Sequence, residues 1–173
     1  MSTPDAGTPG RDGRLRSLAV WLCAALVIIL LDQIVKLWIV QSLSYGQRIR
    51  VLPFFDITLL FNTGAAFSFL ANGGGAQRWL FTGLALVAAV FIAGWLYRNP
   101  RQPVLCAALA SIMGGALGNA ADRLLHGHVV DFLLFYWHDW YFPAFNVADI
   151  AITCGAGLLI LDEIRRARHK PDS

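Results

Sequence analysis

Residues 18–40 read LAVWLCAALVIILLDQIVKLWIV, an apolar run interrupted only by Asp32, Gln33 and Lys36. About 20 apolar helical residues are needed to cross the hydrocarbon core of a bilayer. The run therefore predicts a membrane-spanning helix. Basic residues precede it, as they do in a cleavable signal peptide, but the apolar region of such a peptide has only about 7–15 residues and ends at a small-x-small cleavage site. Because no such site follows this longer run, we expect a first helix that is retained.

Three further apolar runs have similar lengths. The four predicted spans are residues 18–40, 79–97, 104–122 and 145–163. Over the 173 residues, 57% are apolar and 14% are charged, against about 45–50% and about 25% in soluble domains. A chain this short cannot bury that much apolar surface within itself, so lipid is the expected surroundings. The net charge of only +3 does not indicate a nucleic-acid partner.

The basic residues predict the orientation of the spans. Nine of the fourteen flank one side of the predicted bundle: Arg11, Arg14, Arg16, Arg98, Arg101, Arg165, Arg166, Arg168 and Lys170. Short loops rich in Lys and Arg stay in the cytoplasm. Both termini are therefore expected in the cytoplasm, and the connections 41–78 and 122–146 are expected on the outer side.

The remaining segments complete the predicted organisation. Composition predicts a disordered cytoplasmic tail at 1–16. A membrane domain is expected at 17–165 and a second cytoplasmic tail at 166–173. The outer segment 44–70 contains the β-prone run RIRVLPFFDITLLF followed by a turn signal at 62–64, which predicts a small sheet or hairpin on the membrane surface. The second outer connection is rich in aromatic side chains, and these are typical of an interfacial belt or could line a groove for a lipid substrate.

Ionisable groups within the spans are costly and are candidates for function. Asp32 and Lys36 lie four residues apart with the acid first, the favourable order for a helical ion pair. They are interpreted either as a pair that neutralises itself within the bundle or as a substrate contact. Asn119 and Asp122 share a helix face, and Arg123 follows. Interhelical hydrogen bonding is the structural alternative to a functional role here.

Two further acids lie toward the outer side. Asp131 could be a solvated loop carboxylate, and Asp149, three residues after Asn146, could belong to a capping box at a helix start. Both are nevertheless expected near the same interface. Two carboxylates that approach one another cannot both ionise, so one can activate water while the other polarises a carbonyl group. The pattern therefore predicts an aspartyl catalytic pair.

Other chemistries have weaker support. His126, His128 and Asp131 could be imagined as metal ligands, but their spacing matches no established pattern and HExxH is absent from the sequence. The sequence also has no G-x-S-x-G, P-loop or dinucleotide-binding glycine pattern. The three cysteines lie in apolar runs without metal-binding spacing. We expect neither a metal nor a cofactor.

Five short motifs in order resemble the lipoprotein signal peptidase family, also called signal peptidase II. They are Leu31-Asp32-Gln33 with Lys36, Asn62-Thr63-Gly64-Ala65-Ala66-Phe67-Ser68, Gly118-Asn119-Ala120-Ala121-Asp122-Arg123, Val130-Asp131-Phe132 and Phe145-Asn146-Val147-Ala148-Asp149. Each motif is weak alone, but all five occur in order on four predicted spans. The resemblance covers residues 18–162.

The resemblance implies a fold, an activity and partners. The fold is an all-α membrane protein with four transmembrane helices and a small β-cradle on the extracytoplasmic face. The activity is an aspartyl endopeptidase that cuts diacylglyceryl-modified prolipoproteins just before the lipidated cysteine. The implied setting is the bacterial inner membrane, with membrane lipid as a partner, the cyclic peptide globomycin as family inhibitor, and a monomer as the expected state.

The resemblance also implies roles for individual residues. The catalytic pair falls on Asp131 and Asp149, and the supporting or substrate-lining residues are Asn62, Gly64, Asn119, Asp122, Arg123 and Asn146. We hypothesise that Asp149 is the base, because a helix N-terminus favours its ionised form.

Two other classes of function remain as alternatives. A proton-coupled transporter could use Asp32, Asp122 and Asp149 as a relay, but its acids should be spread across the membrane depth, and no internal repeat of the transporter kind is visible. A non-catalytic assembly protein of the envelope would tolerate exchange of aspartate for asparagine.

Overall fold

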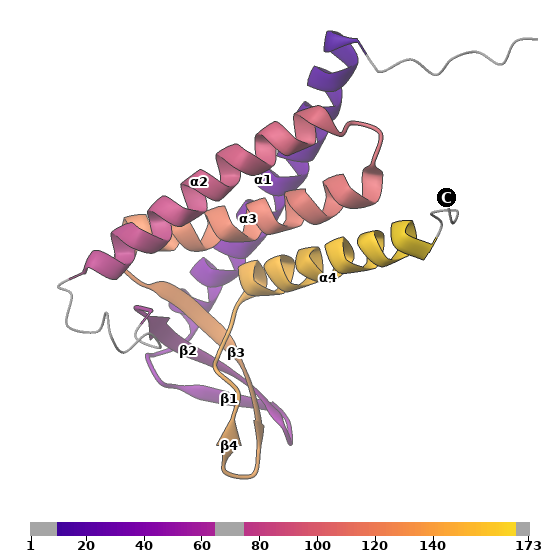
Figure 1. The fold of residues 1–173 in the computed structure, drawn as a ribbon. Coiled ribbons are helices and arrows are strands. Elements are labelled where there is room, and N and C mark those ends of the chain that lie inside the picture. Colours follow the sequence, from indigo (N-terminus) through magenta and orange to yellow (C-terminus); the bar gives the residue numbers. More distant parts are fainter. Residues whose placement is uncertain (1–9, 65–74, 169–173) are drawn as a thin grey trace, which may run out of the picture.

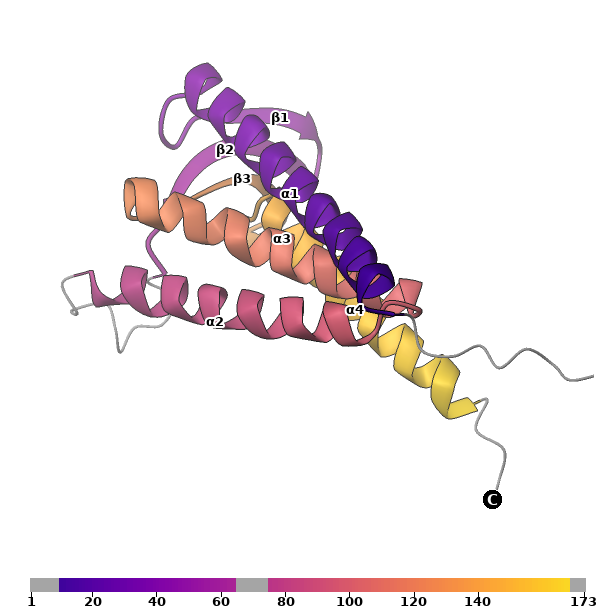
Figure 2. The ribbon, with the colours of Figure 1, turned by 90° about the horizontal axis from the view of Figure 1, so that it is seen from above.

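The computed structural model describes residues 10–64 and 75–168, which form helices and one small sheet (Figure 1). The helices in this part of the chain are α1 (Arg11–Ser42), α2 (Ala76–Arg98), α3 (Pro103–His126) and α4 (Val147–Arg168). The strands are β1 (Arg48–Leu52), β2 (Phe55–Asn62), β3 (Val129–Trp137) and β4 (Trp140–Tyr141). The sheet projects from one end of the helical bundle, where α1 ends and α4 begins (Figures 1 and 2).

Helix α3 is the centre of the bundle and contacts each of the other three helices. It begins with proline at its first position, where no intrahelical N–H is needed, and ends at Gly127 in the left-handed conformation. Its buried face is rich in Ala and Gly, which lets neighbouring backbones approach closely. A Cβ on Gly115 would collide with the carbonyl oxygen of Ala148 in α4.

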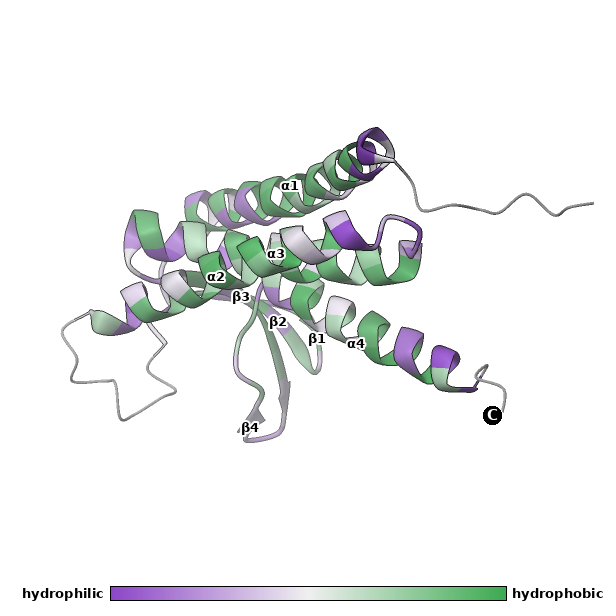
Figure 3. Cartoon of the chain, turned by 45° about the horizontal axis from the view of Figure 1, so that its top comes forward, coloured by the Kyte–Doolittle hydropathy of each residue, from purple (hydrophilic) through white to green (hydrophobic). Residues whose placement is uncertain are grey.

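The described helices consist largely of apolar residues, as the colouring of Figure 3 shows. Large side chains such as Ile34, Val90 and Phe91 have 62%, 75% and 68% of their surface exposed. Contiguous exposed surface of this kind marks an interaction site, here lipid. Among the described helices, α1, α2 and α3 are long and apolar enough to cross a membrane. Helix α4 is not in that set, and it carries Asp149 in its first turn and Asp162 and Glu163 near its other end.

The sheet is antiparallel in the order β1-β2-β3-β4. The hairpin expected in the first outer connection is confirmed as β1 and β2, while residues 65–70 of the predicted segment 44–70 lie outside the described residues. The second outer connection, for which no strand was predicted, also contributes to the sheet. Its run VVDFLLFYW is β-branched and aromatic, so it pairs with β2 as strand β3, with Asp131 opposite Leu60.

The helices also extend beyond the predicted spans. Helix α1 begins at Arg11, so the prediction of a disordered tail over 1–16 fails for residues 11–16. Asp12 in the first turn favours this earlier start through the helix dipole. Helix α4 continues to Arg168 and carries an Asp162–Arg166 ion pair at i,i+4, so residues 166–168 are helical as well. Residues 1–9 and 169–173 lie outside the described part.

The contact at Gly115 yields a prediction about stability. Gly115→Ala should lower the free energy of unfolding by about 1–3 kcal/mol, because the added methyl group must push α3 and α4 apart. Gly83→Ala on α2 is the matched control, since a Cβ there meets nothing within 4 Å. The control should leave stability unchanged or raise it slightly. Thermal unfolding of both variants in detergent, followed by circular dichroism, gives the comparison, and equal midpoints would contradict the close packing.

Candidate active site

A cluster of polar side chains lies where α1, α3, β3 and the start of α4 meet. Such groups are rarely buried unless they are paired. Six of them are buried: Asp32, Lys36, Asn119, Asp122, Asp131 and Asn146. Asp149 and Arg123 are half-buried at its edge, and Asn62 is exposed. The structure therefore gathers residues from five separate motifs at one end of the bundle.

Asn146 connects the two predicted catalytic acids. Its side-chain amide Nδ2 donates to Asp131 Oδ1 at 2.7 Å. Its Oδ1 accepts from the backbone N–H of Asp149 at 3.0 Å, and its own backbone N–H donates to Asp149 Oδ2 at 3.3 Å. This reciprocal pair is the capping box expected from the spacing. One side chain thus bridges Asp131 on β3 and Asp149 in the first turn of α4.

Asp131 is held on a strand in a buried position. Asn62 Nδ2 donates to its Oδ2 at 2.9 Å, and the backbone N–H of Gly64 donates to Asn62 Oδ1 at 2.8 Å. The bond from Gly64 fixes the Asn62 amide with its NH2 group toward Asp131. Gly64 has φ of +85°, and a Cβ there would lie 3.0 Å from the Phe81 ring, so glycine suits this turn.

The surroundings of Asp131 favour its protonated form. Burial raises the pKa of Asp131 to about 6, the hydrogen bond from Asn62 opposes the rise, and the negative charge of Asp149 adds to it. The hydrogen bond from Asn146 and the charge of Lys36 also oppose the rise. Loss of water around the carboxylate is therefore the dominant cause.

Lys36 is the centre of a buried ion cluster. Its Nζ lies 2.7 Å from Asp32 Oδ2 and 2.8 Å from Asp122 Oδ2. The expected i,i+4 pair of Asp32 and Lys36 is confirmed, and Asp122 joins it from α3. The other oxygen of Asp32, Oδ1, accepts from the backbone N–H of Ala148 at 2.9 Å. Asp122 accepts from the backbone N–H of Val130 at 3.1 Å.

The orientation of the Asn119 amide follows from Lys36. Lys36 Nζ donates to Asn119 Oδ1 at 2.9 Å, and Asn146 Nδ2 donates to the same oxygen at 3.2 Å. Because an ammonium group can only donate, the amide must turn its oxygen to Lys36. Its Nδ2 then donates to Asp149 Oδ1 at 2.8 Å. Lys36 thus fixes the Asn119 amide with its donor toward Asp149.

Arg123 borders the acids from the last turns of α3. Its Nη1 donates to the backbone oxygen of Asn119 at 3.3 Å, and its guanidinium lies 5.0 Å from the centre of the Phe81 ring. Its positive charge interacts with Asp149, Asp131 and Asp122. The predicted supporting residue thus lies beside both acids.

Sequence reasoning gave no role to Gln33, although its place within an apolar run was a signal. Gln33 Nε2 donates to Asp122 Oδ1 at 2.7 Å, so it completes the hydrogen bonding of that carboxylate. The alternative of a metal at His126, His128 and Asp131 finds no support in the described residues, which contain no group of three or more such ligands. Both Asp131 oxygens instead accept from amides.

An apolar cavity of about 400 Å3 opens beside Asp149. It is lined by Phe142, Phe145, Asp149, Ile150, Thr153 and Cys154. Phe142 belongs to the aromatic group of the second outer connection, for which an interfacial belt or a substrate groove was expected. The cavity thus brings one of these aromatic side chains beside Asp149.

The chain is similar to known proteins of one family. Residues 24–165 match the family described as signal peptidase (SPase) II. Proteins named lipoprotein signal peptidase are similar to the chain. One from Paraburkholderia phymatum is 54% identical over 152 residues, which cover 88% of this chain and 92% of that protein. One from Paraburkholderia phytofirmans is 55% identical over 152 residues, covering 88% of each. A bacterial membrane enzyme solved by the in meso method at 1.9 Å aligns with a TM-score of 0.75 and 28% identity, over 89% of this chain and 95% of that one.

The ion cluster yields a second prediction. Lys36→Met should lower the free energy of unfolding by about 3–5 kcal/mol, because two buried carboxylates lose their cation. The double variant Asp32→Asn/Lys36→Met should be more stable than Lys36→Met alone, since the new amide oxygen would still accept from the Ala148 N–H and only one buried carboxylate, Asp122, would then lack its cation. Denaturant titrations in mild detergent would measure both. Simple additivity of the two single changes would contradict a shared ion cluster.

Proposed function

Because the chain belongs to the signal peptidase II family, we propose that Asp131 and Asp149 are the catalytic pair with which it cleaves lipoprotein signal peptides. The observation that carries the proposal is the Asn146 bridge, which ties one buried and one half-buried carboxylate together at the end of the bundle. In finer terms, the chain is an aspartyl endopeptidase. Its substrate is a diacylglyceryl-modified prolipoprotein, cut just before the lipidated cysteine.

The two acids have different tasks in the proposed reaction. Ionised Asp149 takes a proton from water while the water oxygen attacks the scissile carbonyl carbon. Protonated Asp131 gives its proton to the carbonyl oxygen, so a neutral gem-diol forms. Asp149 then returns a proton to the leaving nitrogen as the C–N bond breaks, and Asp131 recovers a proton from the diol. Acid–base help of this kind contributes about 10²–10⁴ in rate.

The surroundings of the acids support this assignment. Asp131 has a pKa of about 6 because it is buried, so it holds a proton more readily than an ordinary aspartate. Asp149 lies in the first turn of α4, where the helix dipole favours negative charge. It also accepts hydrogen bonds from Asn119 and from the backbone of Asn146.

The proposed setting completes the functional assignment. Helix α4 is the fourth span, both termini lie in the cytoplasm of the bacterial cell, and the site lies at the extracytoplasmic face of the inner membrane.

A transmembrane helix keeps its backbone hydrogen bonds internal, so a signal peptide must unwind to be cut. The four-stranded sheet beside the site offers hydrogen bonds to the freed backbone. The apolar cavity beside Asp149 suits the lipid on the cysteine. Globomycin is expected to occupy the same site, and a monomer should suffice for activity.

Substitution of either acid tests the catalytic pair. Asp131→Asn and Asp149→Asn should each lower cleavage of a lipid-modified prolipoprotein by at least about 10²-fold, because the pair then lacks its acid or its base. The matched control is Asp139→Asn, an exposed aspartate in the β3–β4 turn, which should cleave normally. Activity of the unaltered protein should persist in EDTA. Normal cleavage by either site variant would favour a non-catalytic role, and loss in EDTA would indicate a metal.

The pKa of Asp131 predicts the pH dependence. The proposed reaction needs Asp131 protonated, and a carboxyl group loses its proton as pH rises through its pKa. The value of kcat/KM should therefore fall as pH rises through about 6. The midpoint of this descending limb of the pH profile is an apparent pKa of the coupled pair of acids. Removing the Asn62 hydrogen bond takes away a contact that lowers this pKa, so Asn62→Ala should move the limb to higher pH. A limb moving to lower pH would contradict the assignment.

A further inference from the structure

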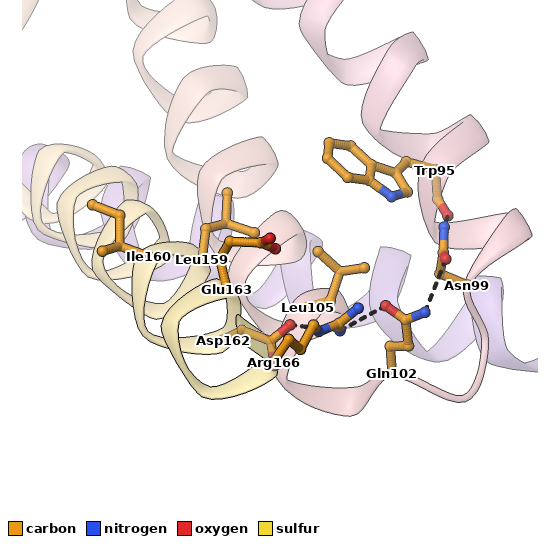
Figure 4. Close-up of a pocket in the computed structure, with 9 residues that line it drawn as sticks. All are labelled: Trp95, Asn99, Gln102, Leu105, Leu159, Ile160, Asp162, Glu163 and Arg166. Carbon is orange, nitrogen blue, oxygen red and sulfur yellow. Dashed lines mark hydrogen bonds and ion pairs between the residues drawn. The ribbon is translucent and has the colours of Figure 1, made fainter. Parts of the chain in front are cut away.

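A second cavity, which has charged and polar side chains in its lining, lies at the opposite end of the bundle. It has a volume of about 370 Å3 and lies between the α2–α3 connection and the last turns of α4 (Figure 4). Its lining residues are Trp95, Asn99, Gln102, Leu105, Leu159, Ile160, Asp162, Glu163 and Arg166. Glu163 lies 14 residues after Asp149 on α4, and a helix rises about 1.5 Å per residue, so this cavity is roughly 20 Å from the proposed catalytic pair. The cleavage reaction gives it no role.

On one side of the cavity, the guanidinium group of Arg166 is fixed in position by two polar contacts. Arg166 Nη2 lies 2.5 Å from Asp162 Oδ2 and donates to Gln102 Oε1 at 2.7 Å. Gln102 Nε2 in turn donates to Asn99 Oδ1 at 3.2 Å, as the dashed lines in Figure 4 show. Both contacts of Arg166 use Nη2. Its Nε and Nη1 hydrogens therefore remain able to bind a further acceptor such as a phosphate oxygen.

The same cavity also presents a carboxylate. Glu163 lines it, and in Figure 4 its oxygens point into the space between α4 and Trp95. Within residues 10–64 and 75–168, the structure gives Glu163 no hydrogen bond and no ion pair. A ligand that fits both sides of the cavity must carry an anionic and a cationic group.

The remaining wall is apolar, and its surroundings are those of a membrane interface. Trp95, Leu105 and Leu159 form part of this wall, and tryptophan is enriched at the level of lipid headgroups. Arg98, Arg101 and Arg168 lie on the same end of the bundle. Since α2 and α3 are both candidate spans, their connection places the cavity where headgroups meet acyl chains.

We propose that this cavity binds a zwitterionic phospholipid of the phosphatidylethanolamine type. Arg166 and Gln102 donate to the phosphate, Glu163 accepts from the primary ammonium, and an acyl chain follows the apolar wall. Phosphatidylglycerol has the phosphate but no cation for Glu163. Phosphatidylcholine has a cation without N–H donors. Both should therefore bind more weakly than the ethanolamine lipid.

Native mass spectrometry of the full chain in detergent tests the proposal. The chain should bind phosphatidylethanolamine about tenfold more tightly than phosphatidylglycerol or phosphatidylcholine of the same acyl chains, which corresponds to one charge-assisted hydrogen bond. Glu163→Gln should abolish this preference. Arg166→Gln should weaken binding of all three lipids about tenfold. Arg168→Gln, an exposed arginine near the end of α4, is the matched control and should change nothing.

Two further measurements make the test decisive. Glycerophosphoethanolamine, which has the headgroup but no acyl chains, should compete poorly, and equal competition would show a site for a soluble ligand instead. Prolipoprotein cleavage by Glu163→Gln should match the unaltered protein, which verifies folding. If Arg166→Gln fails to fold, Glu163→Gln carries the test, because Glu163 makes no hydrogen bond or ion pair within the described residues. Equal binding of the three lipids to the unaltered chain, or a preference that survives Glu163→Gln, would overturn the proposal.

Discussion

The buried ammonium group of Lys36 is the contact on which the site depends. It lies on α1, pairs with Asp32 on its own helix and with Asp122 on α3, and reaches Asn119. A buried ion pair seldom adds net stability, because desolvation offsets the attraction, but breaking one is costly. Lys36 therefore restricts the bundle to one arrangement of α1 against α3. That same arrangement aims the Asn119 amide at Asp149.

The ion cluster also positions the two elements that carry the acids. Asp122 accepts the backbone N–H of Val130, the residue before Asp131 on β3. Asp32 accepts the backbone N–H of Ala148, the residue before Asp149 on α4. Each carboxylate thus fixes the backbone next to one member of the proposed catalytic pair. Gly118 allows this arrangement, since a Cβ there would lie 2.9 Å from Asp32 Oδ2.

Contacts close in sequence could be predicted, whereas those between distant segments could not. The Asp32–Lys36 pair and the Asn146–Asp149 capping box follow from helical spacing. The Lys36–Asp122 ion pair and the Asn62–Asp131 hydrogen bond depend on packing between elements, for which local spacing gives no signal. Strand β3 was missed because its aromatic residues were interpreted as an interfacial belt. The resemblance to a family supplied Asn62 and Asn119 as site residues, but it did not say what they contact.

The geometry makes two identical side chains chemically different. Asp131 lies on a strand, is 3% exposed, and accepts from the side-chain amides of Asn62 and Asn146. Asp149 is half-buried and lies at a helix N-terminus, with a side-chain amide and a backbone N–H as donors. Burial raises the pKa of Asp131, although its two amide donors oppose the rise. In the proposed reaction the proton therefore rests on Asp131. Since Gly64 and Lys36 fix the amides of Asn62 and Asn119, the asymmetry is built in before substrate arrives, so it belongs to the fold rather than to the substrate.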